Sequence, residues 1–361
     1  MEKEIRLMKG NEALAEAAIR TGVDGYFGYP ITPQSEVLEY LSLERPHLRT
    51  GMVVLQAESE VAAINMVYGG AGTGKKVMTS SSSPGVSLKQ EGISYIAGAE
   101  LPALIVNVMR AGPCLGAIQP GQADYFQATK GGGHGDYRLI TLAPSSVQEM
   151  YDFVDLAFTL AFKYRTPAMI LSDGAIGQMM EKVAVGPQQE RLADDKIKEK
   201  YPWATTGRKK GHERTFITSL DLDPYNFEKH NHVLQAKYKK IEENEVRVEM
   251  LNMEDADYAI VAFGTSARVS FKAMDLLRAK GHKVGLVRPI TLWPFPKNEI
   301  GALTDHVKGF LTVEMNAGQM VEDVKLAVNG KVPVEFYGRM GGVIPSPEEV
   351  VEAMEQKIIG G

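Results

Sequence analysis

Short apolar stretches alternate with longer amphipathic ones over the first half of the chain. The apolar stretches lie at residues 25–28, 52–55, 76–79, 101–109, 138–142 and 167–171, and they predict buried strands. Helical spacing of apolar residues predicts helices over 11–21, 34–43, 58–70, 86–98 and 147–163. Strands and helices that alternate at this spacing form parallel strands joined by crossover helices. The pattern therefore predicts an α/β fold with a doubly wound parallel sheet.

The regular pattern stops near residue 186 and resumes near residue 254. The stretch between is rich in charged residues and turn formers, and it predicts one helix, over 233–243. A connection of this length is too long for an ordinary loop, so we expect an arm that lies over its own domains or over another subunit. Its lysine-rich part is expected to be a solvated face.

Alternation returns in the last third of the chain. Strands are predicted at 258–263, 283–287, 310–314 and 334–337, and residues 288–296 are expected to form a proline-stiffened turn. They indicate a second, smaller α/β domain with about four parallel strands. The expected division is therefore a first domain over 1–185, an extended linker over 186–253 and a second domain over 254–361.

Composition limits the classes of function. The net charge of −5 gives no basic field for nucleic acid or for a membrane surface. No apolar stretch approaches the roughly 20 residues of a membrane-spanning helix, and the first ten residues lack an apolar signal core, so we expect a cytoplasmic protein. A single cysteine, Cys114, cannot form an internal disulfide, a zinc cage or an iron–sulfur cluster by itself.

Two glycine-rich stretches resemble ligand-binding motifs. The stretch Gly69–Lys75 matches the first seven positions of a phosphate-binding P-loop, but Lys76 stands where a hydroxyl is needed. A helix also precedes its glycines, so we expect them to end that helix. The stretch Gly131–Gly135 contains His134 and no second metal ligand nearby. It is expected to line a cavity or a subunit contact.

Polar residues follow several of the predicted strands. Because carboxyl ends of parallel strands share one edge of a sheet, Thr32, Glu60, Ser80–Ser83 and Arg110 are expected on one ligand-binding rim. Arg110 can hold a carboxylate through two parallel hydrogen bonds, or it can be a surface arginine in a loop. Glu58 and Glu60 either complement the dipole of their helix or, if buried, need a partner for the charge. The serines offer donors to a ligand, since no histidine base adjoins them.

Several of these stretches resemble one enzyme family. YPITP (29–33), QAESEVAAINMVYGGAG (56–72), TSSSSPGVSLKQEGISY (79–95), VNVMRAGP (106–113) and RPITLWPFP (288–296) are similar to the alpha subunit of 2-oxoacid:ferredoxin oxidoreductases. Within that family the chain most resembles the branched-chain (2-oxoisovalerate, or 3-methyl-2-oxobutanoate) enzymes, and the 2-oxoglutarate enzymes are the alternative. The apolar segment 115–118 after Arg110 favours the branched-chain acid.

The resemblance implies a thiamine diphosphate enzyme that oxidatively decarboxylates a 2-oxo acid to its acyl-CoA, with ferredoxin as electron acceptor. The first domain would bind the pyrimidine ring, and the second would resemble the transketolase carboxyl-terminal domain. Glu60 matches the glutamate that bonds the aminopyrimidine, and Thr32 and Arg110 match the groups that hold the substrate carboxylate. These three are the candidate catalytic residues. The candidate cofactor-binding set adds Tyr29, Pro30, Ser82 and Ser83.

The resemblance also implies partner chains. Such enzymes hold the diphosphate through magnesium with a GDG motif and an asparagine roughly thirty residues on. The nearest candidate here is Ser172-Asp173-Gly174, with no asparagine before Asn226. We therefore expect no metal ligand in this chain, magnesium and iron–sulfur clusters on partners, and inactivity of the isolated chain. A beta, a gamma and a ferredoxin-like subunit are expected, together with further copies of this chain. A non-catalytic scaffold for the beta chain remains an alternative.

Overall fold

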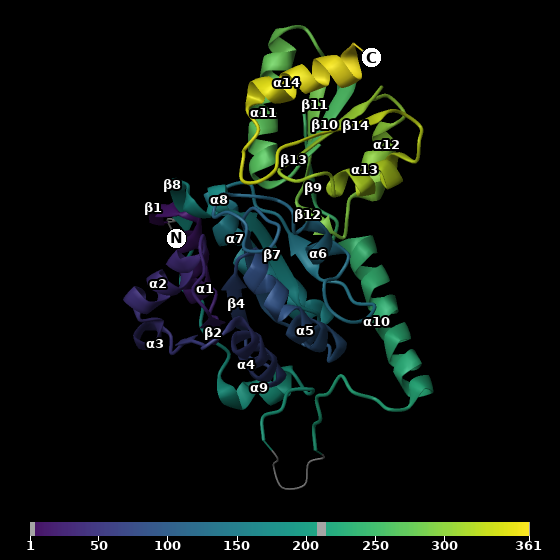
Figure 1. The fold of residues 1–361 in the computed structure, drawn as a ribbon. Helices are drawn as coiled ribbons and strands as arrows, with labels where there is room; N and C mark the ends of the chain where they lie inside the picture. Colours follow the sequence, from purple (N-terminus) through teal and green to yellow (C-terminus); the bar gives the residue numbers. More distant parts are fainter. Residues whose placement is uncertain (1–3, 208–213, 361) are drawn as a thin grey trace.

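A computed structural model of the chain describes residues 4–207 and 214–360, which form two α/β lobes (Figure 1). The larger lobe is built on a seven-stranded sheet in the order β12-β6-β7-β5-β4-β2-β3. Its strands are β2 (Gly25–Gly28), β3 (Val53–Gln56), β4 (Val77–Ser81), β5 (Leu104–Met109), β6 (Ile140–Leu142), β7 (Ala168–Asp173) and β12 (Thr291–Trp293). Every neighbouring pair is parallel except β12 with β6. The predicted doubly wound parallel sheet is confirmed.

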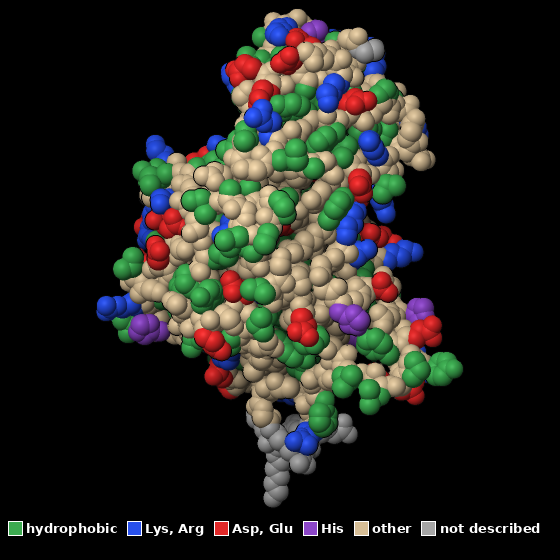
Figure 2. Space-filling model, in the orientation of Figure 1, with side chains coloured by type: hydrophobic (Ala, Val, Ile, Leu, Met, Phe, Trp, Pro, Cys, Tyr) green, Lys and Arg blue, Asp and Glu red, His purple; other side chains and the backbone are tan. Residues whose placement is uncertain are grey.

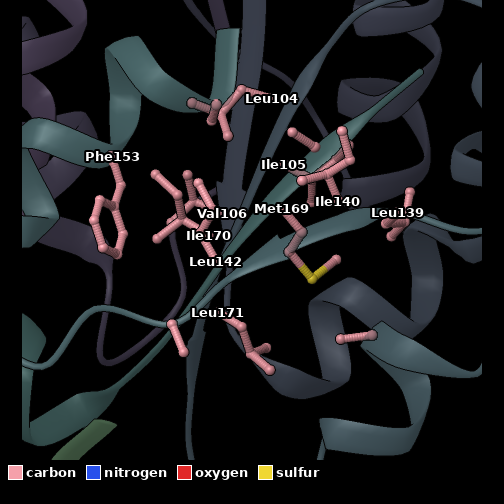
Figure 3. Packing of buried hydrophobic residues seen from close by; sticks show 14 of the residues in the cluster. Leu104, Ile105, Val106, Leu139, Ile140, Leu142, Phe153, Met169, Ile170 and Leu171 are labelled. Atoms are coloured by element: carbon pink, nitrogen blue, oxygen red, sulfur yellow. The ribbon is translucent and has the colours of Figure 1, made fainter. Parts of the chain in front are cut away.

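The helices of this lobe follow the predicted order. They are α1 (Gly10–Arg20), α2 (Ser35–Glu44), α3 (Pro46–Arg49), α4 (Glu60–Gly72), α5 (Ser83–Gly98), α6 (Tyr125–Thr129), α7 (Val147–Tyr164) and α8 (Gly174–Gln178). Helices α4 and α5 pack together, as do α1 and α7. The central strands β5 and β7 are buried along their whole length, as expected for parallel strands covered on both faces. Figure 3 shows the apolar side chains of β5, β6 and β7 packed against one another.

The smaller lobe contains a five-stranded sheet in the order β14-β13-β10-β11-β9. Its elements are β9 (Val248–Leu251), β10 (Tyr258–Ala262), α11 (Gly264–Ala279), β11 (Val284–Pro289), α12 (Lys297–Leu303), β13 (Phe310–Glu314), α13 (Met320–Val328), β14 (Val334–Gly338), α14 (Pro347–Met354) and a π-helical turn (Glu355–Ile359). The four predicted strands are present and parallel. β9, which was not predicted, adds an antiparallel fifth strand beside β11.

Three predictions about strands were wrong. Residues 52–55 were expected to be a buried strand, but β3 is the edge of its sheet, and its side chains are largely exposed. No strand of the first domain was predicted after residues 167–171, but β8 (Met180–Val185) follows them and pairs antiparallel with β1 (Glu4–Lys9). The expected turn over 288–296 contains β12, which leaves the smaller lobe and joins the larger sheet beside β6.

The segment between the lobes is partly helical. It contains α9 (Asp194–Lys200) and α10 (Pro224–Asn244), which is longer than predicted because Asp223 caps its first turn. Figure 1 shows α10 running beside the larger lobe, where Lys237 bonds Glu100 at 3.0 Å. Part of the lysine-rich stretch, residues 208–213, lies outside the described residues. The domain boundaries at 185/186 and 253/254 stay a prediction.

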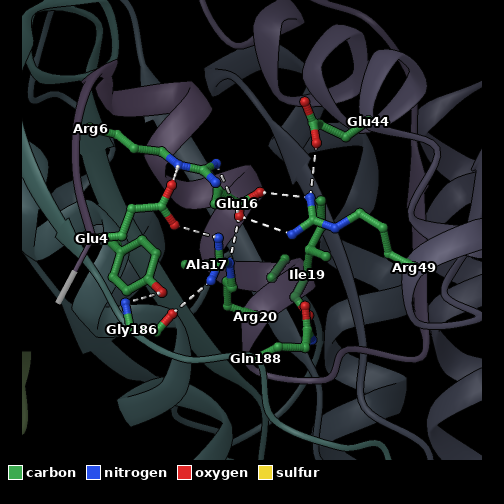
Figure 4. A network of polar contacts seen from close by, with 12 residues as sticks. Glu4, Arg6, Glu16, Ala17, Ile19, Arg20, Glu44, Arg49, Gly186 and Gln188 are labelled. Carbon is green, nitrogen blue, oxygen red and sulfur yellow. Dashed lines mark hydrogen bonds and ion pairs between the residues drawn. The ribbon is translucent and has the colours of Figure 1, made fainter. Parts of the chain in front are cut away.

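A buried carboxylate ties the amino-terminal elements together (Figure 4). Glu16 in α1 forms ion pairs with Arg20 at 2.7 Å, Arg49 at 3.1 Å and Arg6 at 3.3 Å. Burial raises the pKa of Glu16, but hydrogen bonds from Arg49 and Arg20 outweigh it, so the pKa lies below its ordinary value. The network therefore stabilises the fold above the ordinary pKa of glutamate, and that stabilisation is lost as the pH falls through the lowered value.

Candidate functional site

The carboxyl edge of the larger sheet brings Arg110 and the Thr32 turn together. Arg110 directly follows β5, and its side chain is buried. Its Nη1 donates to the carbonyl oxygen of Thr32 at 3.0 Å, and its Nη2 donates to that of Leu115 at 2.9 Å. Within the described residues its Nε has no partner. Arg110 is therefore held in place by two backbone carbonyl groups while its Nε keeps no partner, which excludes a loose surface arginine.

Ser83, the first residue of α5, connects its own helix to β5 and to the residue that precedes α6. Its N–H donates to Oδ1 of Asn107 at 3.0 Å, and its hydroxyl donates to Oδ2 of Asp124 at 2.6 Å. The same hydroxyl accepts the N–H of Arg110 at 3.0 Å. Burial raises the pKa of Asp124, although the hydrogen bonds from Ser83 and Asn107 oppose it. The Ser83 hydroxyl therefore holds Arg110 in place and is already occupied by protein groups.

The other serines of this stretch differ in what they can offer a ligand. Ser80 is bonded to Tyr26 and Gln34. The hydroxyls of Ser81 and Ser82 are buried and have no hydrogen-bond partner within the described residues. A buried polar group without a partner costs free energy unless something else pairs with it. Ser81 and Ser82 are therefore the serines left to bind a ligand.

Glu60 is the first residue of α4 and is 7% exposed, whereas Glu58 lies in the exposed turn before it. A Cβ atom at Gly85 of α5 would lie 2.8 Å from Oε1 of Glu60 and closer still to the Ser81 hydroxyl. Any larger residue at this position would force the side chains of Ser81 and Glu60 to move. Within residues 4–207 and 214–360, the Glu60 carboxylate forms no hydrogen bond and no ion pair. The choice of Glu60 over Glu58 thus has a structural basis: Glu60 is a buried carboxylate that forms no hydrogen bond or ion pair with the described residues.

A pocket of about 790 Å³ adjoins Arg110. It lies between the loop that follows β5, the start of α5 and two loops of the smaller lobe that contain Met315 and Met340. Among the described residues that line it, Arg110 is the one basic side chain and Asp124 the one acidic side chain. Leu115, from the apolar segment 115–118, is among the lining residues, and Ile118 is not. The pocket therefore offers one cation beside a largely apolar wall.

The remaining predicted residues take varied positions. The side chains of Thr32 and Pro30 are exposed, and Tyr29 is half-buried with its carbonyl oxygen bonded to Gln34. Thr32 reaches Arg110 through its carbonyl oxygen, so its hydroxyl remains available. Asp173 is fully committed to structure: it caps α8 and accepts the Thr265 hydroxyl at 2.6 Å, which joins the two lobes.

The glycine-rich stretches behave as predicted. Gly69 to Gly72 lie in the last turn of α4, and Gly74 follows with a φ of +78°, so they end a helix and form no phosphate loop. His134 and Gly135 line a second pocket, of about 700 Å³, beside α5 and α10. The prediction that this stretch lines a cavity is confirmed.

Sequence reasoning missed Asn107 and the residues from the smaller lobe. Asn107 Nδ2 donates to Oδ2 of Asp124 at 2.9 Å, so it fixes both Asp124 and Ser83. A signal existed, because Asn107 is the one polar residue in the apolar stretch 101–109. No comparable signal marks Met315 or Met340, which reach the pocket only because the lobes pack together.

Comparison with known proteins gives the family. Residues 16–253 match the family model for pyruvate flavodoxin/ferredoxin oxidoreductase, thiamine diphosphate-binding. Residues 256–350 match the model for pyruvate:ferredoxin oxidoreductase core domain II. A ketoisovalerate oxidoreductase subunit VorB from Methanothermobacter thermautotrophicus is 49% identical over 97% of both chains. A 2-oxoglutarate synthase subunit KorA from the same organism is 35% identical over 95% of this chain and 96% of that relative.

Solved structures agree with this assignment. The 2-oxoglutarate:ferredoxin oxidoreductase from Magnetococcus marinus, with 2-oxoglutarate, coenzyme A and succinyl-CoA bound, superposes with a TM-score of 0.84 at 27% identity. The match covers 98% of this chain and 65% of that one. An inactive split-gene transketolase shares the fold alone, with a TM-score of 0.55 at 13% identity. In the described residues no helix is both long and apolar enough to cross a membrane. The family predicted from the sequence motifs is confirmed: the chain belongs to the thiamine diphosphate-dependent 2-oxoacid:ferredoxin oxidoreductases.

Proposed function

We propose that this chain is the alpha-type subunit of an enzyme that oxidatively decarboxylates a branched-chain 2-oxo acid, 2-oxoisovalerate, to its acyl-CoA, with ferredoxin accepting the electrons. The unpaired carboxylate of Glu60 carries the proposal. Burying a carboxylate is costly unless a partner uses its charge or its proton. Because no described residue forms a hydrogen bond or an ion pair with Glu60, we infer that the aminopyrimidine ring of thiamine diphosphate is that partner.

The residues around Glu60 fit the ring end of that cofactor. The glycine at position 85 keeps α5 close without a side chain, and the hydroxyls of Ser81 and Ser82 are free to form hydrogen bonds. When bound, thiamine diphosphate supplies the electron sink that decarboxylation of a 2-oxo acid requires. In this proposal Glu60 would share a proton with the ring nitrogen. Arg110 and Thr32 would orient the substrate carboxylate, which is lost as carbon dioxide.

The diphosphate end requires another chain. Asp173 is the nearest match to a magnesium-binding motif, but its carboxylate already accepts hydrogen bonds from the first turn of α8 and from Thr265. We therefore propose that a beta subunit binds magnesium and the diphosphate, and that gamma and ferredoxin-like subunits complete the enzyme. Next to Glu60, the edge strand β3 and the start of α4 expose Val53, Leu55 and Val61. These exposed apolar side chains suit a seam with that subunit. Figure 2 shows hydrophobic and acidic side chains interspersed on the face that carries α4 and α5.

The pocket beside Arg110 supports the branched-chain acid over 2-oxoglutarate. A 2-oxoglutarate molecule carries a second carboxylate, which needs its own cation. The described lining provides no second basic side chain, and Asp124 would repel that group. An isopropyl group, by contrast, can pack against Leu115, Met315 and Met340. The higher identity to the ketoisovalerate relative than to the 2-oxoglutarate relative points the same way.

Rates with the two acids test this assignment. We expect the reconstituted complex to favour 2-oxoisovalerate over 2-oxoglutarate by about 10²-fold or more in kcat/KM, since an unpaired buried charge costs several kcal/mol. Leu115→Arg places a second cation in the pocket and should narrow that ratio at least tenfold, whereas Leu115→Met, a control of similar volume, should leave it unchanged. A preference for 2-oxoglutarate in the unmodified complex would show that the substrate assignment is wrong.

A further inference from the structure

Helix α5 contains a buried lysine that the proposed mechanism does not use. Lys89 is 0% exposed, and its Nζ donates one hydrogen bond, to Oγ1 of Thr79 at 3.1 Å. Within the described residues no carboxylate lies within ion-pair distance of it. Lysine is almost never fully buried without a charged partner, because burial removes the hydration of its ammonium group. A role outside ordinary packing is therefore needed to explain its position.

The packing of α5 on α4 places Lys89 behind Glu60. Residues 85, 89 and 92 share one face of α5, because they are spaced at helical intervals. On that face Gly85 lies against Glu60, and Gly92 lies against Ile64, one turn further along α4. Lys89 therefore sits between these two contacts. Below it, Thr79 and Ser81 point from β4 toward the same helices, since alternate residues of a strand share a face.

Two other titratable groups lie near this cluster. Asp124 is hydrogen-bonded to Ser83 and Asn107. The phenol of Tyr26 is hydrogen-bonded to Ser80, whose side chain lies on the opposite face of β4. Burial lowers the pKa of Lys89 to about 8, and attraction to Glu60 opposes that shift. Within the described residues, Glu60 is thus the carboxylate that Lys89 acts on most directly.

We propose that Lys89 is a positioning residue that tunes the proton affinity of Glu60 from behind, an inference that rests on the proposed contact of Glu60 with the aminopyrimidine ring. A cation near a carboxylate favours its ionised form. The ammonium of Lys89 therefore makes Glu60 release its proton to the ring nitrogen more readily. Lys89 itself touches neither the ring nor the substrate; it acts through the charge of Glu60.

The test compares pH profiles in the reconstituted complex. Two pH profiles are measured: that of kcat/KM, and that of thiamine diphosphate affinity determined by calorimetry. The reference is the apparent pKa that is present in both profiles and that Glu60→Gln abolishes. Removal of the cation in Lys89→Met should raise this pKa by about one unit, the size expected for a neighbouring charge in a partly buried site. Lys89→Arg keeps the charge and should leave the pKa near its original value. Lys89→Gln is a second neutral variant.

The melting temperature separates the proposed role from a packing role, because the two roles predict opposite changes of it in Lys89→Met. The lowered pKa of Lys89 means that its buried charge destabilises the fold below about pH 8, and that this cost disappears as the pH rises from about 8 toward the ordinary value of 10.5. Lys89→Met should therefore raise the melting temperature at neutral pH while it alters the pH profile. The gain in melting temperature should shrink as the pH approaches 10.5.

The outcomes separate this inference from the proposed function. If Lys89→Met and Lys89→Gln both keep the reference pKa within a few tenths of a unit while Glu60→Gln is inactive, the role of Lys89 is refuted and the proposed function stands. If Glu60→Gln retains activity, the proposed function itself is refuted. A lower melting temperature in Lys89→Met at neutral pH would indicate that Lys89 serves packing alone.

Discussion

Replacing Glu60 with glutamine should lower kcat of the reconstituted complex by about 10²-fold or more, the range expected for a general acid–base group. Glutamine has nearly the same shape and fits the same space beside Gly85, but it can neither give nor take the proton of a ring nitrogen. The measurement is steady-state oxidation of 2-oxoisovalerate with saturating thiamine diphosphate and coenzyme A. The size of the loss in kcat measures how much proton transfer by Glu60 contributes to catalysis.

The chain offers a matched control two residues away. Glu58 precedes the same helix but is exposed, so Glu58→Gln should keep activity within about twofold of the unmodified complex. The two variants change net charge equally at the same helix end, so any effect through the helix dipole would appear in both. Activity within a few-fold of normal in Glu60→Gln would favour the alternative in which this chain only scaffolds its partner.

Arg110→Met should reduce kcat/KM for the 2-oxo acid by about 10²-fold or more, because a carboxylate then loses a charge-assisted hydrogen bond worth a few kcal/mol. Arg110→Lys should recover only part of the loss. The guanidinium bonds the backbone oxygens of Thr32 and Leu115 and still keeps Nε free, and an ammonium cannot reproduce that fork.

Binding of thiamine diphosphate serves as the control for Arg110. Since Arg110 is proposed to act on the substrate, cofactor affinity measured by titration should change less than threefold in Arg110→Met. An unchanged KM and kcat for the acid, or a loss of cofactor binding that accounts for the whole defect, would show that Arg110 does not hold the carboxylate.

Much of the larger sheet could be predicted because its central strands begin with apolar residues and are buried along their whole length. Parallel strands buried on both faces give continuous apolar stretches, and those at 76–79, 101–109 and 167–171 mark β4, β5 and β7. The rule that polar groups follow such strands then located Arg110 and Glu60 on one edge. Apolar content alone could not show that β3 is an edge strand, because an edge that another chain covers is apolar too.

Features that depend on long-range packing could not be predicted. β12 has only three residues and is flanked by prolines, so nothing local indicates that it joins the larger sheet. The serines at 80–83 look equivalent in sequence, but the structure engages Ser80 and Ser83 and leaves Ser81 and Ser82 without partners. That difference arises because successive side chains of β4 lie on opposite faces of the sheet, and because the chain then turns into α5. Each hydroxyl therefore has different neighbours.

The most direct measurement is a structure of the assembled complex with thiamine diphosphate bound. The account predicts that the Glu60 carboxylate lies within hydrogen-bond distance, about 2.6–3.2 Å, of the aminopyrimidine ring nitrogen. It also predicts that the diphosphate and magnesium contact a different chain. A cofactor bound with its ring away from Glu60, or with its diphosphate held by this chain, would contradict the account.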